Sequence, residues 1–445
     1  MQKKIVAVAA TLLCASSLPV FAQSTGASKV ELWGIVDAAV RHTNNEGAAK
    51  KGLTKMIGGG MSQSRWGINV EEDLGGGSKA LVHLENRFNA DTGEKDATAP
   101  FFQLAYVGLQ GPYGRLTMGR QWNVLFDVVS STYASFPYSP YMDAYKPELG
   151  MAAGARTSNV LKYMLATPDR SWVGSLQYSF GEGNNTQAAQ NSAVEYVRNN
   201  TSYGAALPAQ ANPTYKGIVD GVIKNIDPDN PAAGTETLIK NVKSAASGAL
   251  KTAGGFLRYS NDGFSLGGGY LRTYLPGKTK LDAWTVGGSY RKDKIYINAG
   301  YGLNKVKRPT FSTGTVREYV EYKASQYTDQ QTLNAFWEGQ TNGGFQAGDA
   351  DKRQMYKIGF GYQLTPQINA GLHYFHAKQS GSVNGQSNGK ADFLVALANY
   401  AFSKRTDAYF GVDHTKVSGG SAMYVDSTSK ARKRTGITVG LRHRF

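Results

Sequence analysis

The chain contains sixteen segments of roughly ten residues in which apolar and polar side chains alternate, and none of its 14 prolines falls inside them. In the last segment, for example, Ile437, Val439 and Leu441 alternate with Thr438 and Gly440. Alternation with a period of two predicts β-strands that have one apolar and one polar face. The predicted strands are residues 30–41, 62–74, 78–89, 101–110, 113–122, 156–166, 171–180, 253–260, 264–275, 281–291, 295–305, 353–364, 367–378, 391–402, 406–416 and 433–445.

The connections between these segments are alternately long and short. The short ones carry the residues of tight turns, as at residues 75–77, 261–263 and 292–294. The long ones include residues 42–61, 123–155, 181–252 and 306–352. An even number of strands, with tight turns at one end and long loops at the other, predicts an all-β fold, a 16-stranded antiparallel transmembrane β-barrel with short periplasmic turns and long extracellular loops.

Residues 1–22 have the pattern of a secretory signal peptide. Lys3 and Lys4 precede an apolar run that contains the single cysteine, Cys14, and Val20-Phe21-Ala22 supplies the small residues of a cleavage site. No later stretch has the 18 or so consecutive apolar residues of a membrane helix, whereas a β-strand crosses a bilayer with about 9 to 11 residues. We therefore expect residues 23–445 to form one exported barrel, whose lumen is too wide for side chains to fill and so holds an aqueous channel.

Several short motifs resemble those of the general porins of Gram-negative outer membranes, of the beta-proteobacterial type. The similarity is carried by residues 32–38 (LWGIVDA), 64–67 (SRWG), 72–77 (EDLGGG), 105–109 (AYVGL) and 118–121 (MGRQ). The resemblance implies a homotrimer of sixteen-stranded barrels, each with its own pore, and passive diffusion of small hydrophilic solutes. It also implies that Phe445 is the terminal aromatic residue read by the assembly machinery, and that residues 123–155 fold inward as a constriction loop with Lys146-Pro147-Glu148-Leu149-Gly150 as its motif.

A pore constriction sets basic side chains of the wall against acids of the inward loop, and the resulting field orients passing ions. The predicted basic wall is Arg65, Arg87, Arg120 and Lys162, and the predicted loop acids are Asp127, Asp143 and Glu148. Arg65 and Arg87 point inward by alternation. Arg120 takes its place from the resemblance, because alternation puts it on the face of Leu116 and Met118; a bulge or a surface covered by another subunit would reconcile the two.

The formal net charge is +16, of which Lys3 and Lys4 contribute two. A positive lumen favours anions. The alternative is that loop cations such as Lys430, Arg432, Lys433 and Arg434 bind phosphates of outer-membrane lipid and lipopolysaccharide.

Two further functions stay open: a substrate-selective channel, and a surface-binding or adhesion role for residues 181–252, in which residues 235–250 are expected to be helical.

Other classes of function are disfavoured. The basic residues are scattered along an exported chain, which is unlike a nucleic-acid-binding protein. His373 and His376 fall on opposite faces of one strand, so neither a metal nor another cofactor is expected. No G-x-S-x-G motif indicates a hydrolase, so we expect a channel and not an enzyme.

Overall fold

The computed structural model describes residues 28–95, 100–135, 148, 150–181, 194, 197–198, 202, 213–245, 251–274, 280–307, 350–382, 385–426 and 428–445. The predicted signal peptide, residues 1–22, and the predicted loop acid Asp143 lie outside these residues.

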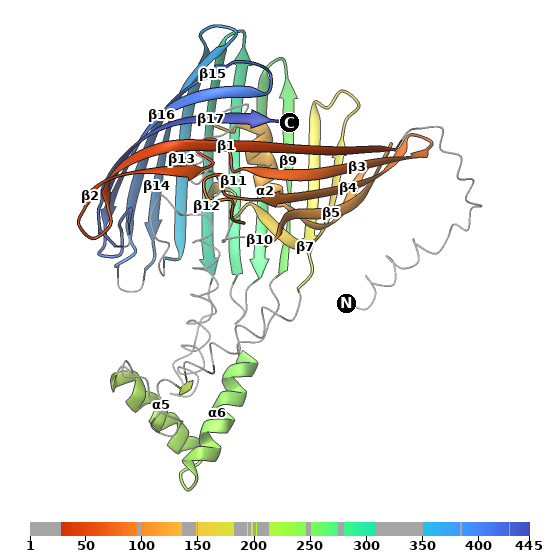
Figure 1. Cartoon of the computed structure of the whole chain (residues 1–445). Helices are drawn as coiled ribbons and strands as arrows, with labels where there is room; N and C mark the ends of the chain where they lie inside the picture. Colours follow the sequence, from red (N-terminus) through yellow and green to blue (C-terminus); the bar gives the residue numbers. More distant parts are fainter. Residues whose placement is uncertain are drawn as a thin grey trace.

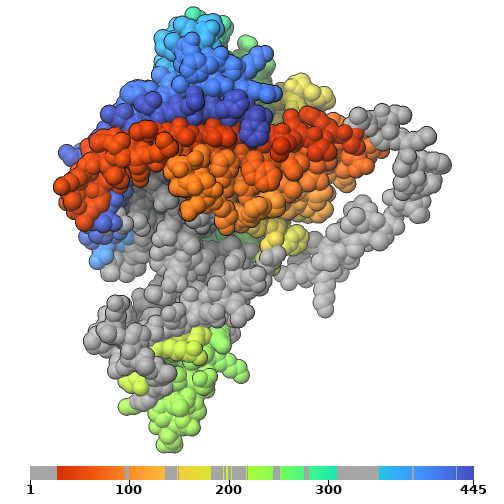
Figure 2. Space-filling model, viewed as in Figure 1, coloured from red at the N-terminus to blue at the C-terminus, as the bar shows by residue number. Residues whose placement is uncertain are grey.

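The strands form one closed antiparallel barrel, as the alternation predicts (Figure 1). From β3 to β17 each strand pairs with its neighbours in the sequence, β2 and β3 both pair with β1, and β1 closes the ring against β17, with Ile35 opposite Arg444 and Thr43 opposite Gly436. Figure 2 shows this seam as the contact between the red first strand and the blue last one. The strands are β1 (Lys29–Glu46), β2 (Lys51–Gly58), β3 (Arg65–Gly75), β4 (Ser78–Arg87), β5 (Phe102–Gly111), β6 (Gly114–Trp122), β7 (Arg156–Ala166), β8 (Trp172–Ser179), β9 (Lys251–Asn261), β10 (Phe264–Tyr274), β11 (Lys280–Lys292), β12 (Ile295–Lys307), β13 (Lys352–Gln363), β14 (Ile368–Ser380), β15 (Gly389–Ala401), β16 (Thr406–Gly419) and β17 (Lys433–Arg444).

Two strands, β2 and β3, pair side by side in the chain order with different parts of β1, and the sequence did not predict this arrangement. β1 continues to Glu46 and turns directly into β2, whose residues 53–58 pair with residues 43–38 of β1. The chain then leaves the wall at residues 59–64 and returns as β3, which pairs with residues 29–35 of β1. The expected long connection at residues 42–61 is therefore wrong, because most of it is a β-hairpin.

The two faces of the wall differ as the alternation predicts. Apolar side chains cover the outside, where Val439 and Leu441 are each more than half exposed, while Thr438 and Arg442 of the same strand are buried on the inside. The tight turns also form as predicted. At residues 75–77 all three glycines have positive φ angles, between +60° and +78°, a conformation that a side chain disfavours.

The longest connection contains a helical hairpin beyond the strand ends (Figure 1). It consists of α5 (Pro213–Ile226) and α6 (Pro231–Ala245). Val222, Ile223, Leu238 and Val242 bury a small apolar core of its own. α6 begins four residues before the predicted helix at residue 235, and residues 246–250 lie outside the described part of the chain. None of the helices among the described residues is both long and apolar enough to span a bilayer.

Candidate functional site

The predicted constriction loop begins with a helix, α2 (Val124–Thr132), that lies against the inner wall of the barrel. Asn123 caps the helix, because its side-chain oxygen accepts from the backbone N–H of Phe126 at 2.8 Å. Its side-chain nitrogen donates to the carbonyl of Gly154 at 2.7 Å, which ties the start of the loop to its end. Val124, Leu125, Val128 and Val129 are fully or almost fully buried in the cluster between α2 and the wall.

Glycines in the wall make room for this loop. A Cβ atom at Gly267 would lie 2.8 Å from Val128 of α2, and one at Gly300 would lie 2.5 Å from the ring of Tyr133. A Cβ atom at Gly269 would lie 2.9 Å from Leu125, one at Gly287 would lie 2.6 Å from Tyr133, and one at Gly302 would lie 3.0 Å from Met151. The glycines of β10–β12 therefore form a floor on which the loop packs at van der Waals distance.

One predicted basic residue and one predicted acid meet where the chain passes from β6 into α2. Lys162 of β7 donates to the carboxylate of Asp127 at 2.7 Å and to the carbonyl of Trp122 at 2.9 Å. Burial raises the pKa of Asp127 above its ordinary value, although the charge and hydrogen bond of Lys162 act in the opposite direction. The pair attaches the helix to the wall.

The far end of the loop is held by a second buried pair. Glu148 forms an ion pair with Lys357 of β13, and it accepts from the backbone N–H and the hydroxyl of Ser135 at 2.8 and 2.6 Å. Lys357 also donates to the carbonyl of Tyr133, whose hydroxyl contacts Thr285 of β11. Lys357 was not predicted. Its alternation with apolar Ile358 and Phe360 was the signal that it points inward.

Arg65 and Arg87 share one carboxylate on the inner wall with a third arginine. Glu85 lies 3.4 Å from Arg65, 3.2 Å from Arg87 and 3.7 Å from Arg156. The Arg156 guanidinium also stacks over Trp122, 3.9 Å from the ring centroid, and Trp122 stacks on Phe126 of α2. This group, which we call the arginine cluster, therefore lies beside the start of α2.

Arg120 lies apart from the arginine cluster. It pairs in register with Ala105 on the outer face of the wall, and the register of β6 and β7 shifts at this point. Its guanidinium donates to the Ser158 hydroxyl at 2.8 Å. The register shift beside Arg120 is the bulge that was considered for this position, whereas cover by another subunit stays a prediction.

A second inward segment went unpredicted, at residues 59–64 between β2 and β3. The carboxylate of Asp37 accepts from three consecutive backbone N–H groups, those of Gly60, Met61 and Ser62, at 2.7 to 3.1 Å. Tyr409 donates to the same carboxylate at 2.5 Å. The run of glycines at residues 58–60 was the signal that the strand could leave the wall here.

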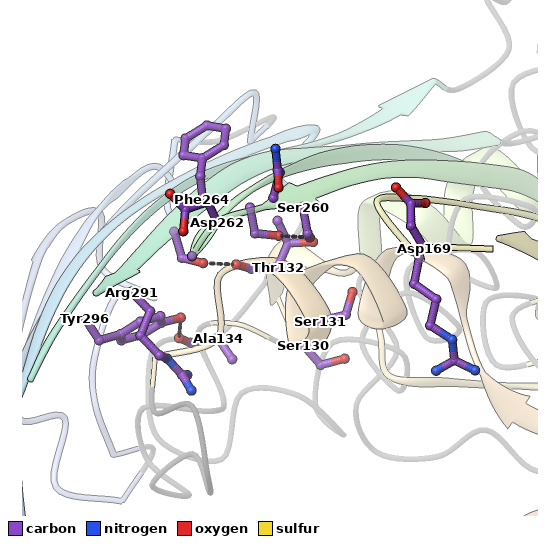
Figure 3. Close-up of a pocket in the computed structure, with 15 residues that line it drawn as sticks. Ser130, Ser131, Thr132, Ala134, Asp169, Ser260, Asp262, Phe264, Arg291 and Tyr296 are labelled. Carbon is purple, nitrogen blue, oxygen red and sulfur yellow. Dashed lines mark hydrogen bonds between the residues drawn. The ribbon is translucent and has the colours of Figure 1, made fainter. Parts of the chain in front are cut away.

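A polar pocket of about 550 Å³ opens below the C-terminal end of α2 (Figure 3). Ser130, Ser131 and Thr132 line it from the helix, and Arg291 and Tyr296 line it from the wall. Tyr296 donates to the carbonyl of Ala134 at 2.7 Å, and Ser289 donates to that of Thr132 at 2.5 Å. Because the pocket also touches the tight turns at residues 169–170 and 261–263, it lies on the side of the barrel away from the long loops.

Phe445 closes the barrel at the end with the tight turns. Its backbone exchanges two hydrogen bonds with Gly34, of 3.1 and 3.0 Å, and its ring covers that glycine. The described residues contain no group of three His, Cys, Asp or Glu side chains close enough to hold a metal ion.

Comparison with known proteins gives one consistent result. The family model of the Gram-negative porins matches residues 9–420. An outer membrane porin of Bordetella pertussis is 26% identical over 405 residues, covering 83% of this chain and 94% of the relative. Outer membrane porin protein 32 of Delftia acidovorans is 32% identical over 174 residues, which cover 37% of this chain and 45% of the relative.

Solved structures agree in fold. The anion-selective porin from Comamonas acidovorans superposes with a TM-score of 0.61 at 21% identity, covering 94% of this chain and all of that one. OmpF of Salmonella typhi superposes with a TM-score of 0.55 at 15% identity, covering 94% and 98%. The chain therefore belongs to the Gram-negative porin family, the β-barrel diffusion channels of the outer membrane.

Proposed function

We propose that this porin conducts small hydrophilic solutes with a preference for anions, and that the arginine cluster sets the preference. The observation that carries the proposal is the gathering of three arginines, Arg65, Arg87 and Arg156, around the one carboxylate of Glu85 on the inner wall. A concentration of basic side chains at a narrow, low-dielectric passage raises the local concentration of anions.

The loop acids support this assignment by what they contact. Asp127 is paired with Lys162 and Glu148 with Lys357, so neither adds an unpaired negative charge opposite the cluster. These two pairs hold the loop in position, and the arginines supply the field. Asp143 remains a predicted acid of the constriction. The selectivity named for the Comamonas porin agrees with this proposal.

The test is the zero-current potential of reconstituted protein in a KCl gradient. Replacing Arg65 and Arg87 together by Gln leaves Glu85 with Arg156 alone, and the chloride-to-potassium permeability ratio should fall toward one. Arg120→Gln, a matched loss of one arginine from the outer face, should leave the ratio unchanged. An unaltered ratio in the double variant would remove the cluster from the selectivity filter.

We also propose that the barrel assembles as a homotrimer. Arg120 lies on the outer face beside Met118, which is 52% exposed. Exposure of a cation to lipid costs free energy, so we expect a neighbouring subunit to cover Arg120. Three equal closure steps per insertion in planar bilayers would support a trimer, and Arg120→Glu should lower the temperature at which the oligomer dissociates; single closures throughout would oppose it.

A second function is favoured by one observation, the separate apolar core of α5 and α6. A loop that folds as its own unit suits binding at the cell surface. Replacement of residues 182–250 by a short linker should then abolish surface binding while single-channel conductance persists. A loss of conductance with unchanged binding would instead place the hairpin in the channel function.

A further inference from the structure

The pocket below the C-terminal end of α2 has no part in the function proposed above (Figure 3). Its volume of about 550 Å³ lies within the range of about 300 to 1,000 Å³ that holds small-molecule ligands. Ser260, Ser265, Ser289 and Tyr296 line it from β9–β12, where they lie on the face that packs toward α2. The pocket is therefore reached from the lumen, between the constriction loop and the tight turns.

Three arginines come to this pocket from three different elements. Arg170, in the turn between β7 and β8, and Arg291 of β11 line it directly. Arg258 of β9 lies at its edge, where the guanidinium donates to the carbonyl of Ser131 at 3.4 Å. Arg170 and Arg258 form no ion pair with any residue that the structure describes, and their positive charges are close enough to oppose each other.

The two carboxylates of the pocket leave these guanidinium groups available. Asp169 accepts from the hydroxyls of Thr167 and Ser171, at 2.5 and 3.0 Å, so it is held within its own turn. Asp262 lies in the turn between β9 and β10, and within the described chain it makes no ion pair. An anion that enters the pocket can therefore accept from arginine N–H groups that no carboxylate occupies.

The end of α2 does not prevent an anion from binding. Free carbonyls at a helix C-terminus repel negative charge, but here the carbonyl of Thr132 accepts from Ser289 at 2.5 Å and that of Ala134 accepts from Tyr296 at 2.7 Å (Figure 3). Because these two hydroxyls donate to carbonyls, their oxygens act toward a ligand only as acceptors. The hydroxyl of Ser131 makes no hydrogen bond with a described residue. The pocket therefore suits a ligand that carries hydroxyl groups as well as a negative charge.

We propose that this pocket binds phosphorylated monosaccharides as they pass through the channel. A phosphate has three terminal oxygens, so it can accept from guanidinium groups that converge from three elements, whereas a carboxylate has only two. The sugar hydroxyls donate to the oxygens of Ser289 and Tyr296 and bond with the hydroxyl of Ser131.

The pocket is separate from the arginine cluster. The cluster lies beside the start of α2 and the pocket lies at its end, and nine helical residues span about 13 Å. The inference rests on the proposed anion preference only because the cluster concentrates the anions that reach the pocket. Two weak sites in succession let a solute bind without being trapped.

The experiment records single channels of the full-length protein in planar bilayers, with glucose 6-phosphate added to each side in turn. A ligand that occupies the pocket interrupts the current, and the frequency and duration of the interruptions give its dissociation constant. The pocket variant carries Arg170→Gln and Arg258→Gln. Its matched control carries Lys404→Gln and Arg405→Gln, which remove the same charge from the tight turn between β15 and β16.

We expect wild-type and control channels to bind glucose 6-phosphate more tightly than inorganic phosphate, gluconate or glucose. The pocket variant should bind it at least on the order of tenfold more weakly, which is the effect of losing one charge-assisted hydrogen bond. Ser131→Ala should weaken binding of glucose 6-phosphate and leave that of inorganic phosphate unchanged. Arg170→Gln alone, at an exposed turn position, should also weaken binding, so the test does not depend on the folding of the double variant.

Four results would overturn the proposal. Equal interruption of wild-type and pocket-variant channels would remove the arginines from the site. Equal affinity of wild type for inorganic phosphate would assign the pocket to a free anion, equal affinity for gluconate would assign it to carboxylates, and equal affinity for glucose would show that the charge is not used. The chloride-to-potassium ratio in KCl reports on the arginine cluster and the interruptions report on the pocket, so a failure of one proposal is distinguished from a failure of the other.

Discussion

The inner wall and the outer rim of this barrel differ in the partners of their basic side chains. Inside, basic side chains meet carboxylates at short range: Arg41 meets Asp413 at 2.7 Å, Lys162 meets Asp127 at 2.7 Å and Arg442 meets Asp407 at 2.8 Å. Outside, on β11–β17, lysine faces lysine at four positions of the register. The inner charges are paired within the polypeptide, whereas most of these rim lysines form no ion pair with a residue that the structure describes.

This difference follows from what each surface must do. A constriction needs a field of fixed shape, so its charges are held by partners and its loop is fastened at both ends. A rim in contact with charged lipid gains by leaving its cations available. Substitutions inside should therefore cost stability by themselves, and substitutions outside should depend on what surrounds the barrel.

The largest effect is expected for Glu148→Gln. It leaves the buried ammonium of Lys357 without its carboxylate, and breaking a buried pair in this way costs about 3 to 5 kcal/mol. The constriction loop should detach from β13, so that the unfolding temperature falls and single-channel conductance rises with greater noise. Replacing both residues, Glu148→Gln with Lys357→Met, should recover much of the loss. A double variant as unstable as the single one would contradict the tether.

The next effect is expected for Gly267→Ala on the floor beneath α2. The added methyl group would lie 2.8 Å from Val128 and 3.0 Å from Thr132, and overpacking of this kind costs about 1 to 3 kcal/mol. Gly268→Ala is the matched control, since its Cβ would lie on the outer face, 3.1 Å from a backbone oxygen and 3.5 Å from Val286. Thermal unfolding compares the two, and adding Val128→Ala should relieve the inner variant only.

Alternation in the sequence was sufficient to predict the barrel, because a membrane wall imposes opposite chemistry on its two faces over every strand. β2 was missed because its own sequence does not alternate in this way. In Lys51–Gly58 an exposed leucine and an exposed methionine fall on opposite faces, so no alternation appears. The inward turn after it depends on Asp37 and three backbone N–H groups, which are contacts between segments that one strand's pattern does not contain.

The candidate site was predicted in parts. Arg65, Arg87, Lys162, Asp127 and Glu148 were named in advance, but which base meets which acid depends on how the loop packs. That packing rests on glycines of β10–β12, whose role appears only when the helix above them is known. Arg120 shows the limit most directly, since alternation put it on the outer face and family resemblance put it in the constriction, and the pattern of β6 alone does not show the register shift with β7 beside it.

A smaller effect is expected outside, for Lys433→Glu. The substitution turns the pair with Lys416 into opposite charges, which should stabilise lipid-free protein by about 0.2 to 1 kcal/mol. In lipid A the same change should lower the unfolding temperature relative to wild type. Unfolding scans in the two media test whether the change in unfolding temperature reverses its sign. A change of the same sign in both media would mean that the stability effect at the rim, as at the inner wall, does not depend on the surroundings.

The smallest effect is expected from pH at Asp127. Because burial raises the pKa of its carboxyl, this group takes up a proton at a higher pH than exposed carboxylates do. Protonation removes a negative charge and leaves Lys162 as an uncompensated cation beside the constriction. Anion preference should therefore increase as the pH falls from about 7 toward the ordinary range of carboxyl groups, near about 4. Asp127→Asn already lacks the charge, so it should show higher anion preference at pH 7 and a smaller change on acidification. Zero-current potentials measured across this range separate the two proteins, and parallel curves would mean that Asp127 does not contribute to the field of the inner wall.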